Sequence, residues 1–484
     1  MPTCKLVIKD EVNVKFEGLD LQMRKTLTNK FKYEIPYARY LPAYKLGRWD
    51  GTVSFFGLGG TTYVSMLEEA LVALEERGWY VEVEDLRDKT QLKFDLIDES
   101  FLSHINWPVG HQLAGQPIVL RDYQVEVINN FLENPQALQE VATGAGKTII
   151  TATLSKICEQ YGDTIVIVPN KSLVTQTEED YLNVGLDVGV YFGDRKELGH
   201  KHTIVTWQSL NILDKKSKNA EAVTTLEEFI KDVRCIIVDE VHQAKADVLK
   251  RLLTQNFAHV PIRWGLTGTI PKEQFEFQGI RAGLGEVINN ISASDLQEKG
   301  VLAQCHVNVI QTEDTQEYKT YQEELKYLTT NEKRIDWIAK LIAKITENGN
   351  TLILVDRISA GNMLQSKLEN SVFISGETKA NDRKEHYDEV KTVNDKIIIA
   401  TYGVAAVGIN IPRIFNLVLL EPGKSFVRVI QSIGRGIRKA EDKDHVQIWD
   451  ITSRCKFAKR HLTQRKKFYK EANYPFTIER IDIG

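Results

Sequence analysis

From about residue 118 onward, the chain repeats one pattern: a short β-branched run, a turn, and then an amphipathic stretch. This alternation is typical of βα units, because parallel strands need a crossover connection, which is usually a helix. One set of apolar runs comprises residues 165–169 (IVIVP), 203–207 (TIVTW), 235–240 (CIIVDE) and 263–269 (RWGLTGT). A second set comprises residues 351–356 (TLILVD), 372–376 (VFISG), 396–401 (KIIIAT) and 417–421 (LVLLE). We therefore predict an α/β protein with two tandem domains, each built on a parallel sheet.

The first 100 residues follow a different pattern. LVIKDEVNVKF and YVEVEDL are typical of strands, and SMLEEALVALEERG is typical of a helix that Ser65 caps and Gly78 ends. The charged, helix-prone stretch of residues 312–348 should include the connection between the two parallel-sheet domains. The expected units are a small α+β domain (residues 1–100), two parallel-sheet domains (101–305 and 306–455) and a basic helical tail (456–484).

Composition limits the classes of protein that remain. A chain of 484 residues is too long for a single hydrophobic core. No apolar run reaches the ~18 residues of a membrane span, and the start MPTCKLVIKDEV carries charges where a signal peptide needs an apolar core. We therefore expect a cytoplasmic protein that has no membrane partner. The five cysteines lie too far apart for a zinc or redox motif, and the formal net charge of -4 requires any nucleic-acid site to be local.

A phosphate-binding loop is predicted in the segment EVATGAGKTIITATL. Gly144, Gly146, Lys147 and Thr148 follow a strand and open an apolar helix. Glycines let the backbone curl so that its N–H groups face phosphate oxygens, and the helix N-terminus adds its positive end. Lys147 would then pair with the β and γ phosphates of ATP, and the Thr148 hydroxyl would coordinate Mg²⁺. The first glycine of the usual pattern is Val141 here, so the match is incomplete.

Two carboxylates follow a later strand. CIIVDEVH places Asp239 and Glu240 at the end of an apolar run. This is the usual position for one carboxylate that holds Mg²⁺ and a second that activates the attacking water. Taken alone, the pair would more simply be two solvated turn residues.

Nine segments, in order, resemble the motif set of superfamily 2 helicases over about residues 120–440. They are LRDYQ (the adenine-reading segment), ATGAGKT (motif I), VPNKSLVTQ (Ia), TWQSL (Ib), DEVH (II), LTGT (III), LILVDR (IV), ATYGVAAVGINIP (V) and QSIGRGIR (VI). Each match is weak alone, but nine in the right order are specific. The resemblance implies two RecA-like domains and an ATP-driven motor that moves on nucleic acid.

The same resemblance implies roles for individual residues. The ATP-binding set is Arg121, Gln124, Thr143, Gly144, Ala145, Gly146, Lys147, Thr148, Gly408 and Asn410. The catalytic set is Lys147, Asp239, Glu240, Gln431, Arg435 and Arg438, with Thr148 and Asp239 holding Mg²⁺. Arg435 and Arg438 would act as arginine fingers that neutralise charge in the transition state. Many relatives carry aspartate where this chain has Asn410, which leaves that role open.

A further set lies where the family holds the nucleic-acid backbone. It comprises Lys171, Ser172, Thr206, Gln208 and Thr401, whose ammonium, hydroxyl and amide groups suit phosphate contacts. Ordinary helix-capping and turn roles remain the alternative for each of them. Thr267 and Thr269 would couple the ATP site to the nucleic-acid site.

The N-terminal region narrows the class of helicase. Residues 30–57 mix basic and aromatic side chains, including Arg48 and Trp49, as surfaces that grip nucleic acid do. By composition alone, the aromatic residues could equally fill the core of a small domain. The tract nevertheless resembles the N-terminal DNA-binding domain of the UvsW family of phage recombination helicases, a similarity that extends to TYGVAAVGI and VQIWDI and covers nearly the whole chain. It implies branched or forked DNA as the partner, in the cytoplasm of a host cell.

What the UvsW family does is remodel DNA by branch migration, fork regression and unwinding of R-loops or D-loops, in recombination, repair and replication. An RNA helicase, a double-strand translocase of the restriction-enzyme kind, and a nucleic-acid-binding scaffold with a degenerate ATP site remain as alternatives. A basic cluster near the C-terminus would add sequence-independent affinity for DNA, or would simply be a solvated helix face. The cluster is Lys456, Lys459, Arg460, Arg465, Lys466 and Lys467.

Overall fold

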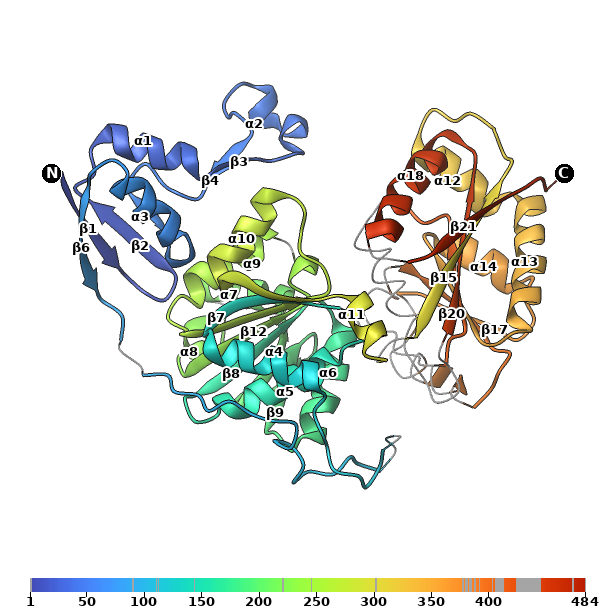
Figure 1. The fold of residues 1–484 in the computed structure, drawn as a ribbon, viewed down its shortest axis with the longest axis horizontal. Helices are drawn as coiled ribbons and strands as arrows, with labels where there is room; N and C mark the ends of the chain where they lie inside the picture. The colour runs from blue at the N-terminus through green and yellow to red at the C-terminus, as the bar shows by residue number, and fades with distance from the viewer. Residues whose placement is uncertain are drawn as a thin grey trace. The chain divides into compact units, whose positions relative to one another are not determined.

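A computed structural model describes this chain as two compact units. The first comprises Met1–Glu140 and Gly146–Asn290, and the second comprises Val141–Ala145 and Ile291–Gly484 (Figure 1). The described residues are 2–483 without 89–90, 110, 112, 143, 220–221, 245, 301–302, 377, 379–381, 383–384, 387–388, 391, 403, 405–412, 424–444 and 472–473.

The N-terminal domain is a small α+β fold, as predicted. Its four-stranded sheet has the order β5-β2-β1-β6, with β1 antiparallel to β2 and parallel to β6. The strands are β1 (Thr3–Ile8), β2 (Asn13–Glu17), β5 (Thr61–Tyr63) and β6 (Tyr80–Asp85). Helices α1 (Leu21–Lys30) and α3 (Leu67–Glu75) add to a core that contains Phe16, Phe31 and Phe56.

A hairpin carries the basic and aromatic tract. Strands β3 (Lys32–Glu34) and β4 (Thr52–Ser54) pair antiparallel, and between them lie η1 (Ala38–Tyr40) and α2 (Pro42–Lys45). The tyrosines of this insertion, Tyr37, Tyr40 and Tyr44, are 44%, 64% and 42% exposed. These three side chains therefore do not fill the core of the small domain, which was the alternative to a nucleic-acid surface.

The first parallel-sheet domain follows the predicted alternation of strands and helices. Its eight strands have the order β10-β9-β11-β8-β12-β13-β7-β14. They are β7 (Gln136–Val141), β8 (Asp163–Val168), β9 (Val188–Phe192), β10 (Arg195–Lys196), β11 (His202–Thr206), β12 (Val233–Asp239), β13 (Ile262–Thr267) and β14 (Glu286–Ile291). The helices are α4 (Asp122–Glu133), α5 (Lys147–Cys158), α6 (Lys171–Asn183), α7 (Trp207–Lys218), α8 (Leu226–Ile230), α9 (Ala246–Arg251) and α10 (Gln274–Leu284). The carboxyl ends of its parallel strands share one edge, so the residues that follow β7, β8, β11, β12 and β13 are brought together.

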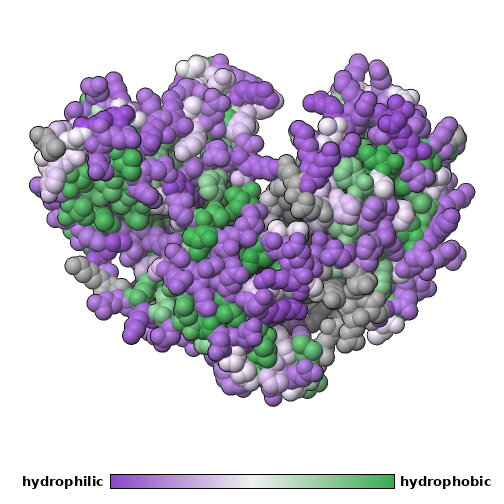
Figure 2. Space-filling view, in the orientation of Figure 1, coloured by the Kyte–Doolittle hydropathy of each residue, from purple (hydrophilic) through white to green (hydrophobic). Residues whose placement is uncertain are grey.

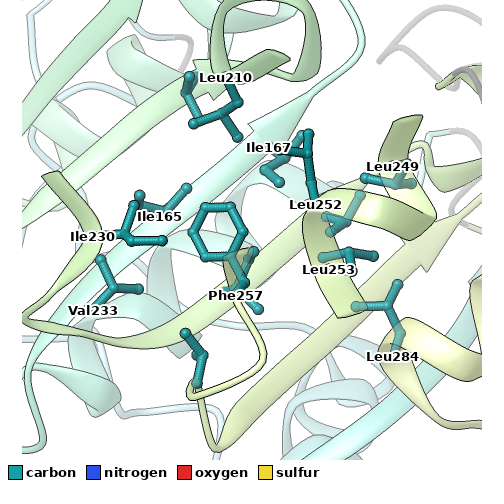
Figure 3. Packing of buried hydrophobic residues seen from close by; sticks show 14 of the residues in the cluster. Ile165, Ile167, Leu210, Ile230, Val233, Leu249, Leu252, Leu253, Phe257 and Leu284 are labelled. Atoms are coloured by element: carbon teal, nitrogen blue, oxygen red, sulfur yellow. The ribbon is translucent and has the colours of Figure 1, made fainter. Parts of the chain in front are cut away.

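One face of this sheet packs against a large apolar cluster. Figure 3 shows the Phe257 ring within it, and Phe257, Leu252 and Leu284 have no exposed surface. At about 1.5–3 kcal/mol for each fully buried large aliphatic or aromatic side chain, such a cluster is the main source of stability for the domain. It fixes the strand ends that carry the candidate site.

The second parallel-sheet domain confirms the other half of the predicted fold. Its seven strands, all parallel, have the order β17-β18-β16-β19-β20-β15-β21. They are β15 (Gln304–Thr312), β16 (Thr351–Val355), β17 (Ser371–Ile374), β18 (Ile397–Thr401), β19 (Asn416–Leu420), β20 (His445–Ser453) and β21 (Phe476–Ile481). The helices are α11 (Ala293–Glu298), α12 (Tyr321–Thr330), α13 (Glu332–Thr346), α14 (Ile358–Gln365) and α18 (Lys456–Glu471).

The charged stretch of residues 312–348 is not the connection between domains. It forms α12 and α13 of the second unit, and Ile335, Ile338 and Ile342 of α13 lie in the core of that unit. The charges occupy the solvent side of amphipathic helices. The second unit also begins earlier than residue 306, because α11 and the first residues of β15 belong to it.

The basic C-terminal segment is not a tail. Its helix α18 is followed by β21, which pairs in parallel with β15 and so completes the second sheet. Arg465 is 3% exposed, and its guanidinium makes two hydrogen bonds of 2.9 Å to the Asp450 carboxylate. Arg465 therefore belongs to the fold and leaves the group of candidate DNA contacts.

Two smaller expectations have different outcomes. Helix α3, which the sequence predicted, is preceded by a 3-10 turn, Val64–Met66, and no side chain caps its N-terminus. The expected capping role of Ser65 is therefore wrong. Gly78 follows this helix with a φ of +71°, a conformation that suits glycine at a helix end. All five cysteines are free and buried.

Specific contacts join the N-terminal domain to the first parallel-sheet domain. The Asn13 side-chain amide donates to the backbone carbonyl of Thr254 at 2.8 Å, and Arg281 forms an ion pair of 2.7 Å with Glu69. The Lys250 ammonium lies 4.4 Å from the centre of the Phe55 ring. These contacts make the N-terminal domain a fixed part of the first unit.

The surface seen in Figure 2 is mostly hydrophilic, with smaller apolar patches. Among the helices that the structure describes, none combines the length and the apolar character needed to cross a bilayer.

Candidate active site

The loop between β7 and α5 has the backbone conformation that a phosphate-binding loop needs. Gly144 and Gly146 take φ angles of +97° and +77°, which residues with a side chain rarely adopt. Helix α5 begins at Lys147, so the N–H groups of its first turn lie next to the loop. The positive φ restricts Gly146 to glycine, and a Cβ atom there would lie 2.8 Å from Nε2 of Gln124, so the Gln124 amide lies next to the loop.

Gln124 connects the predicted adenine-reading segment to this loop. Its Oε1 accepts a hydrogen bond of 3.0 Å from the backbone N–H of Arg121, and its side chain is buried. The Arg121 guanidinium donates to the Tyr123 hydroxyl at 3.1 Å. The Gln124 amide at the first turn of α4 therefore lies beside Gly146 of the loop.

The two carboxylates lie at the end of β12, and one of them contacts the loop lysine. Glu240 follows the strand with φ 50° and ψ 51°, a left-handed conformation that costs about 1 kcal/mol or more for a residue with a side chain. Its Oε1 lies 2.9 Å from Nζ of Lys147, and the two side chains are only 5% and 9% exposed. The backbone N–H of Glu240 donates to Oδ1 of Asp239 at 2.9 Å. The structure thus brings Lys147, Asp239 and Glu240 together from two distant segments.

The backbone N–H of Gly268 in the LTGT segment donates to Oε2 of Glu240 at 3.3 Å, and His242 lies beside the same carboxylate. His242 lies 3.6 Å from Oε2 of Glu240, and its Nδ1 lies 2.6 Å from the Thr267 hydroxyl. That hydroxyl donates its one proton to the backbone carbonyl of Thr269 at 2.8 Å, so Nδ1 of His242 is the donor in the histidine contact. Burial lowers the pKa of His242, although the Glu240 carboxylate opposes this, and the imidazole is therefore neutral at pH 7.

Sequence reasoning did not assign a role to His242. The signal was present, because the residue lies two positions after Glu240 in DEVH. What the sequence could not supply is its partner, since Thr267 lies 25 residues further along the chain. The contact places Thr267 next to His242, beside Glu240.

The predicted nucleic-acid contacts of the first domain have mixed outcomes. Thr206 is 5% exposed, and its hydroxyl accepts a hydrogen bond of 3.3 Å from the N–H of Ser209 at the start of α7. We therefore assign Thr206 to helix capping and no longer to phosphate contact. Gln208 and Lys171 are exposed, and the Gln208 amide donates to the Pro169 carbonyl at 3.2 Å, which links the ends of β11 and β8.

The remaining candidates lie elsewhere or outside the described residues. Thr401 ends β18 in the second unit and is half-buried. Ser172 lies in α6, but its side chain is not described. The residues outside the described part of the chain are Thr143, Gly408, Asn410, Gln431, Arg435 and Arg438.

In the N-terminal tract, Arg48 is exposed and Trp49 is partly buried. The Trp49 indole N–H donates to the Thr52 carbonyl at 2.7 Å, which fixes the ring against the β4 end of the hairpin. Lys32 is paired with Asp50 at 2.6 Å. Arg39, Lys45, Arg48 and the exposed tyrosines are therefore groups of the tract that face solvent.

Two protein families match this chain. The family described as "Type III restriction enzyme, res subunit" matches residues 117–272, and the "Helicase conserved C-terminal domain" matches residues 333–440. The ATP-dependent DNA helicase uvsW of Enterobacteria phage T4 is 24% identical over 93% of this chain and 90% of the phage protein. The DNA 3'-5' helicase XPB of Kineococcus radiotolerans is 24% identical over 76% of this chain and 66% of its own length.

A solved structure supports the fold alone. Dbp5 of S. cerevisiae, in a structure bound to RNA and ADP BeF3, covers 76% of this chain with a TM-score of 0.53 and 15% identity, and the match covers 90% of Dbp5.

Two motor-domain families in tandem, on two parallel sheets that carry the ordered motifs, define an ATP-dependent helicase, and the chain belongs to superfamily 2. Within that superfamily, it is related to the UvsW helicase of phage T4.

Proposed function

We propose that this helicase acts on DNA and remodels branch points, by branch migration, fork regression or unwinding of R-loops and D-loops. The similarity to uvsW over 93% of the chain supports this proposal, because it includes the N-terminal domain that the two motor families do not cover. The exposed Tyr37, Tyr40 and Arg48 of that domain supply aromatic and basic groups suited to nucleic acid. The protein would then work in the cytoplasm of the cell in which its DNA is replicated and recombined.

The proposed ATP site uses the geometry around Lys147. The loop N–H groups and the first turn of α5 would bind phosphate oxygens, and Arg121 and Gln124 would hold the base. The second motor domain would contribute Gln431, Arg435, Arg438, Gly408 and Asn410. Phosphate would compete with Glu240 for the Lys147 ammonium. ATP binding would thereby leave the Glu240 carboxylate without its cation, which makes it a better proton acceptor for the attacking water.

The residues present fit a magnesium ion. The Asp239 carboxylate and the Thr148 hydroxyl are oxygen donors, which Mg²⁺ prefers, and phosphate oxygens and water would complete its coordination. Within the described residues, no group of three or more His, Cys, Asp or Glu side chains could hold a metal ion. When bound, the ion would neutralise negative charge on the phosphate oxygens.

The single observation that carries the motor assignment is the buried Lys147–Glu240 ion pair at the meeting point of loop and strand. The contact between His242 and Thr267 extends from it toward the LTGT segment. Lys171 and Gln208 of the first unit, Thr401 of the second and the N-terminal Arg48 and Trp49 are proposed to hold the DNA backbone.

The test compares substrates and charge-reversal variants. We expect ATP hydrolysis and unwinding to be stronger on forks and four-way junctions than on single strands, duplex or RNA hybrids. Replacing both Arg39 and Arg48 with Glu should weaken action on junctions about tenfold, while ATPase on single strands changes less. The control replaces Lys9 and Lys25 with Glu, since both are exposed on the same domain outside the hairpin and the change in net charge is the same. Equal effects of the two pairs, or stimulation by RNA alone, would contradict the branched-DNA proposal.

A further inference from the structure

A groove lies beside the Ib segment, between α7 and α9. Its volume is about 670 Å³, which is in the usual range for sites that take a small ligand. Trp207, Gln208 and Ile212 from the first two turns of α7 line it on one side, and Val248 and Arg251 of α9 line it on the other. Gln208 stands at the same strand ends as the predicted DNA contacts, because its amide binds the carbonyl of Pro169.

The walls of the groove are apolar at one part and positively charged at another. The apolar part of the wall consists of Trp207, Ile212 and Val248. The Ile212 side chain is 50% exposed, although isoleucine is among the residues most often buried. The charged residues of the lining are three cations, Lys215, Lys218 and Arg251, and one carboxylate, Asp214. The groove therefore has a formal charge of +2. An occupant should therefore have a flat apolar part and a negative part.

The charged part is already ordered. Asp214 is 4% exposed, and its Oδ2 accepts from Arg251 at 2.5 Å and from Lys218 at 2.9 Å. Arg251 also donates to Oδ1 of Asn211 at 2.8 Å. Lys215 is exposed, and its ammonium has no ion-pair partner within the described residues. The Arg251 guanidinium is held in place by Asp214 and Asn211, and the unpaired Lys215 ammonium lines the same groove. Two such cations suit the binding of a phosphate group.

We propose that this groove binds one unpaired nucleotide of the DNA strand, with its base against Trp207, Ile212 and Val248 and its phosphate at Lys215 and Arg251. The inference rests on the proposed action on DNA and adds a site at which the motor holds a base as well as the backbone. A base has an apolar face that packs on aromatic and aliphatic side chains, and its phosphate supplies the negative charge. The site is independent of sequence, since every base offers such a face.

The first experiment measures binding of a fluorescent oligothymidine of about 20 nucleotides to the full chain, with no ATP present. We expect Lys215→Glu to weaken binding about tenfold or more, as the loss of a direct phosphate contact does. Lys216→Glu is the matched control, because it is the next residue on α7, is exposed and does not line the groove. It should weaken binding less than about threefold, through general electrostatics alone. Equal losses for the two variants overturn the proposal.

The second experiment tests for the base. Ile212→Ser should weaken binding of oligothymidine about five- to tenfold and leave binding of an abasic strand of the same length within about twofold. Equal losses on both strands would mean that no base enters the groove. Since Ile212 and Lys215 are both exposed, the variants should fold, and their ATPase without DNA should match the parent.

The outcomes also separate this proposal from the one on which it rests. If the parent protein binds no oligonucleotide, the action on DNA fails. If it binds and the Lys215 and Lys216 variants behave alike, only the groove fails. If a decaglutamate peptide binds in a Lys215-dependent way while the oligonucleotide does not, the groove is a site for an acidic protein segment and the proposal is overturned.

Discussion

Replacing Glu240 with Gln should have two opposite effects at the ATP site. Turnover should fall by about a thousandfold or more, because the amide cannot accept the proton of the attacking water. Affinity for ATP should rise, because Lys147 no longer has to leave a carboxylate before it binds phosphate. The second effect follows from the ion pair in this structure, and motif resemblance alone does not predict it.

The size of the affinity gain can be worked from the contact. An N–O distance of 2.9 Å between two buried side chains is that of a charge-assisted hydrogen bond, which contributes about 1.5–3 kcal/mol. The Gln carbonyl still accepts from Lys147 as a neutral partner, for about 1 kcal/mol. The difference of about 0.5–2 kcal/mol corresponds to ATP binding that is about 2- to 30-fold tighter.

The assay is an equilibrium titration with a fluorescent ATP analogue, together with phosphate release at saturating ATP and DNA. Glu140→Gln is the matched control, because Glu140 is the last residue but one of β7, close to the loop, and its carboxylate accepts from the Ile270 N–H, at 3.4 Å, and from Asn290. The control should change neither quantity by more than about threefold. Unchanged or weaker ATP binding in Glu240→Gln, with the fold intact, would refute the competition between phosphate and Glu240. Unchanged turnover would remove Glu240 from the mechanism.

Two predictions concern stability. Burial raises the pKa of Glu421 to about 7, against the Arg334 guanidinium 2.6 Å away, so the native state binds the proton more tightly than the unfolded chain. The stability that the protonated Glu421 contributes is complete below the unfolded carboxyl pKa of about 4.3, and it is lost as the pH rises through 7. The unfolding free energy of the parent minus that of Glu421→Gln should therefore fall between pH 5 and pH 8, and a difference independent of pH would contradict it. Phe257→Ala should cost about 3–5 kcal/mol in denaturant unfolding of the first unit, because Phe257 is fully buried in the cluster of Figure 3. A loss under about 1 kcal/mol would mean that the cluster relaxes around the cavity.

The sequence predicted the central strands of the two parallel sheets well because these strands are buried on both faces. Residues 235–239 and 397–401 are apolar almost throughout, since both faces of such a sheet are covered. The order of motifs then placed Lys147, Asp239 and Glu240 at one sheet edge. Neither signal depends on contacts far apart in the chain.

The errors arose where burial, and not residue type, decides the role. Arg465 occurs within a run of basic residues, yet its guanidinium donates to the buried Asp450 carboxylate, which also accepts from the Tyr469 hydroxyl of the same helix, α18. The charges of α12 and α13 indicated a linker, yet both helices bury one face in the second unit. Thr206 has the side chain of a phosphate contact, but the same hydroxyl satisfies the first turn of α7.

The N-terminal domain is held by the elements that directly follow the ATP-site motifs, and this has a mechanical consequence. Helix α9 comes after DEVH and carries Lys250, which lies over the Phe55 ring, while α10 comes after LTGT and carries Arg281, which pairs with Glu69. Both motifs are in turn connected to each other through His242 and Thr267. Helix α10 also carries Phe275, whose ring lies with its centre 5.8 Å from that of Tyr37 in the hairpin. Because the domain and the first sheet belong to one unit, DNA bound at the hairpin, as proposed, would move with the first motor domain.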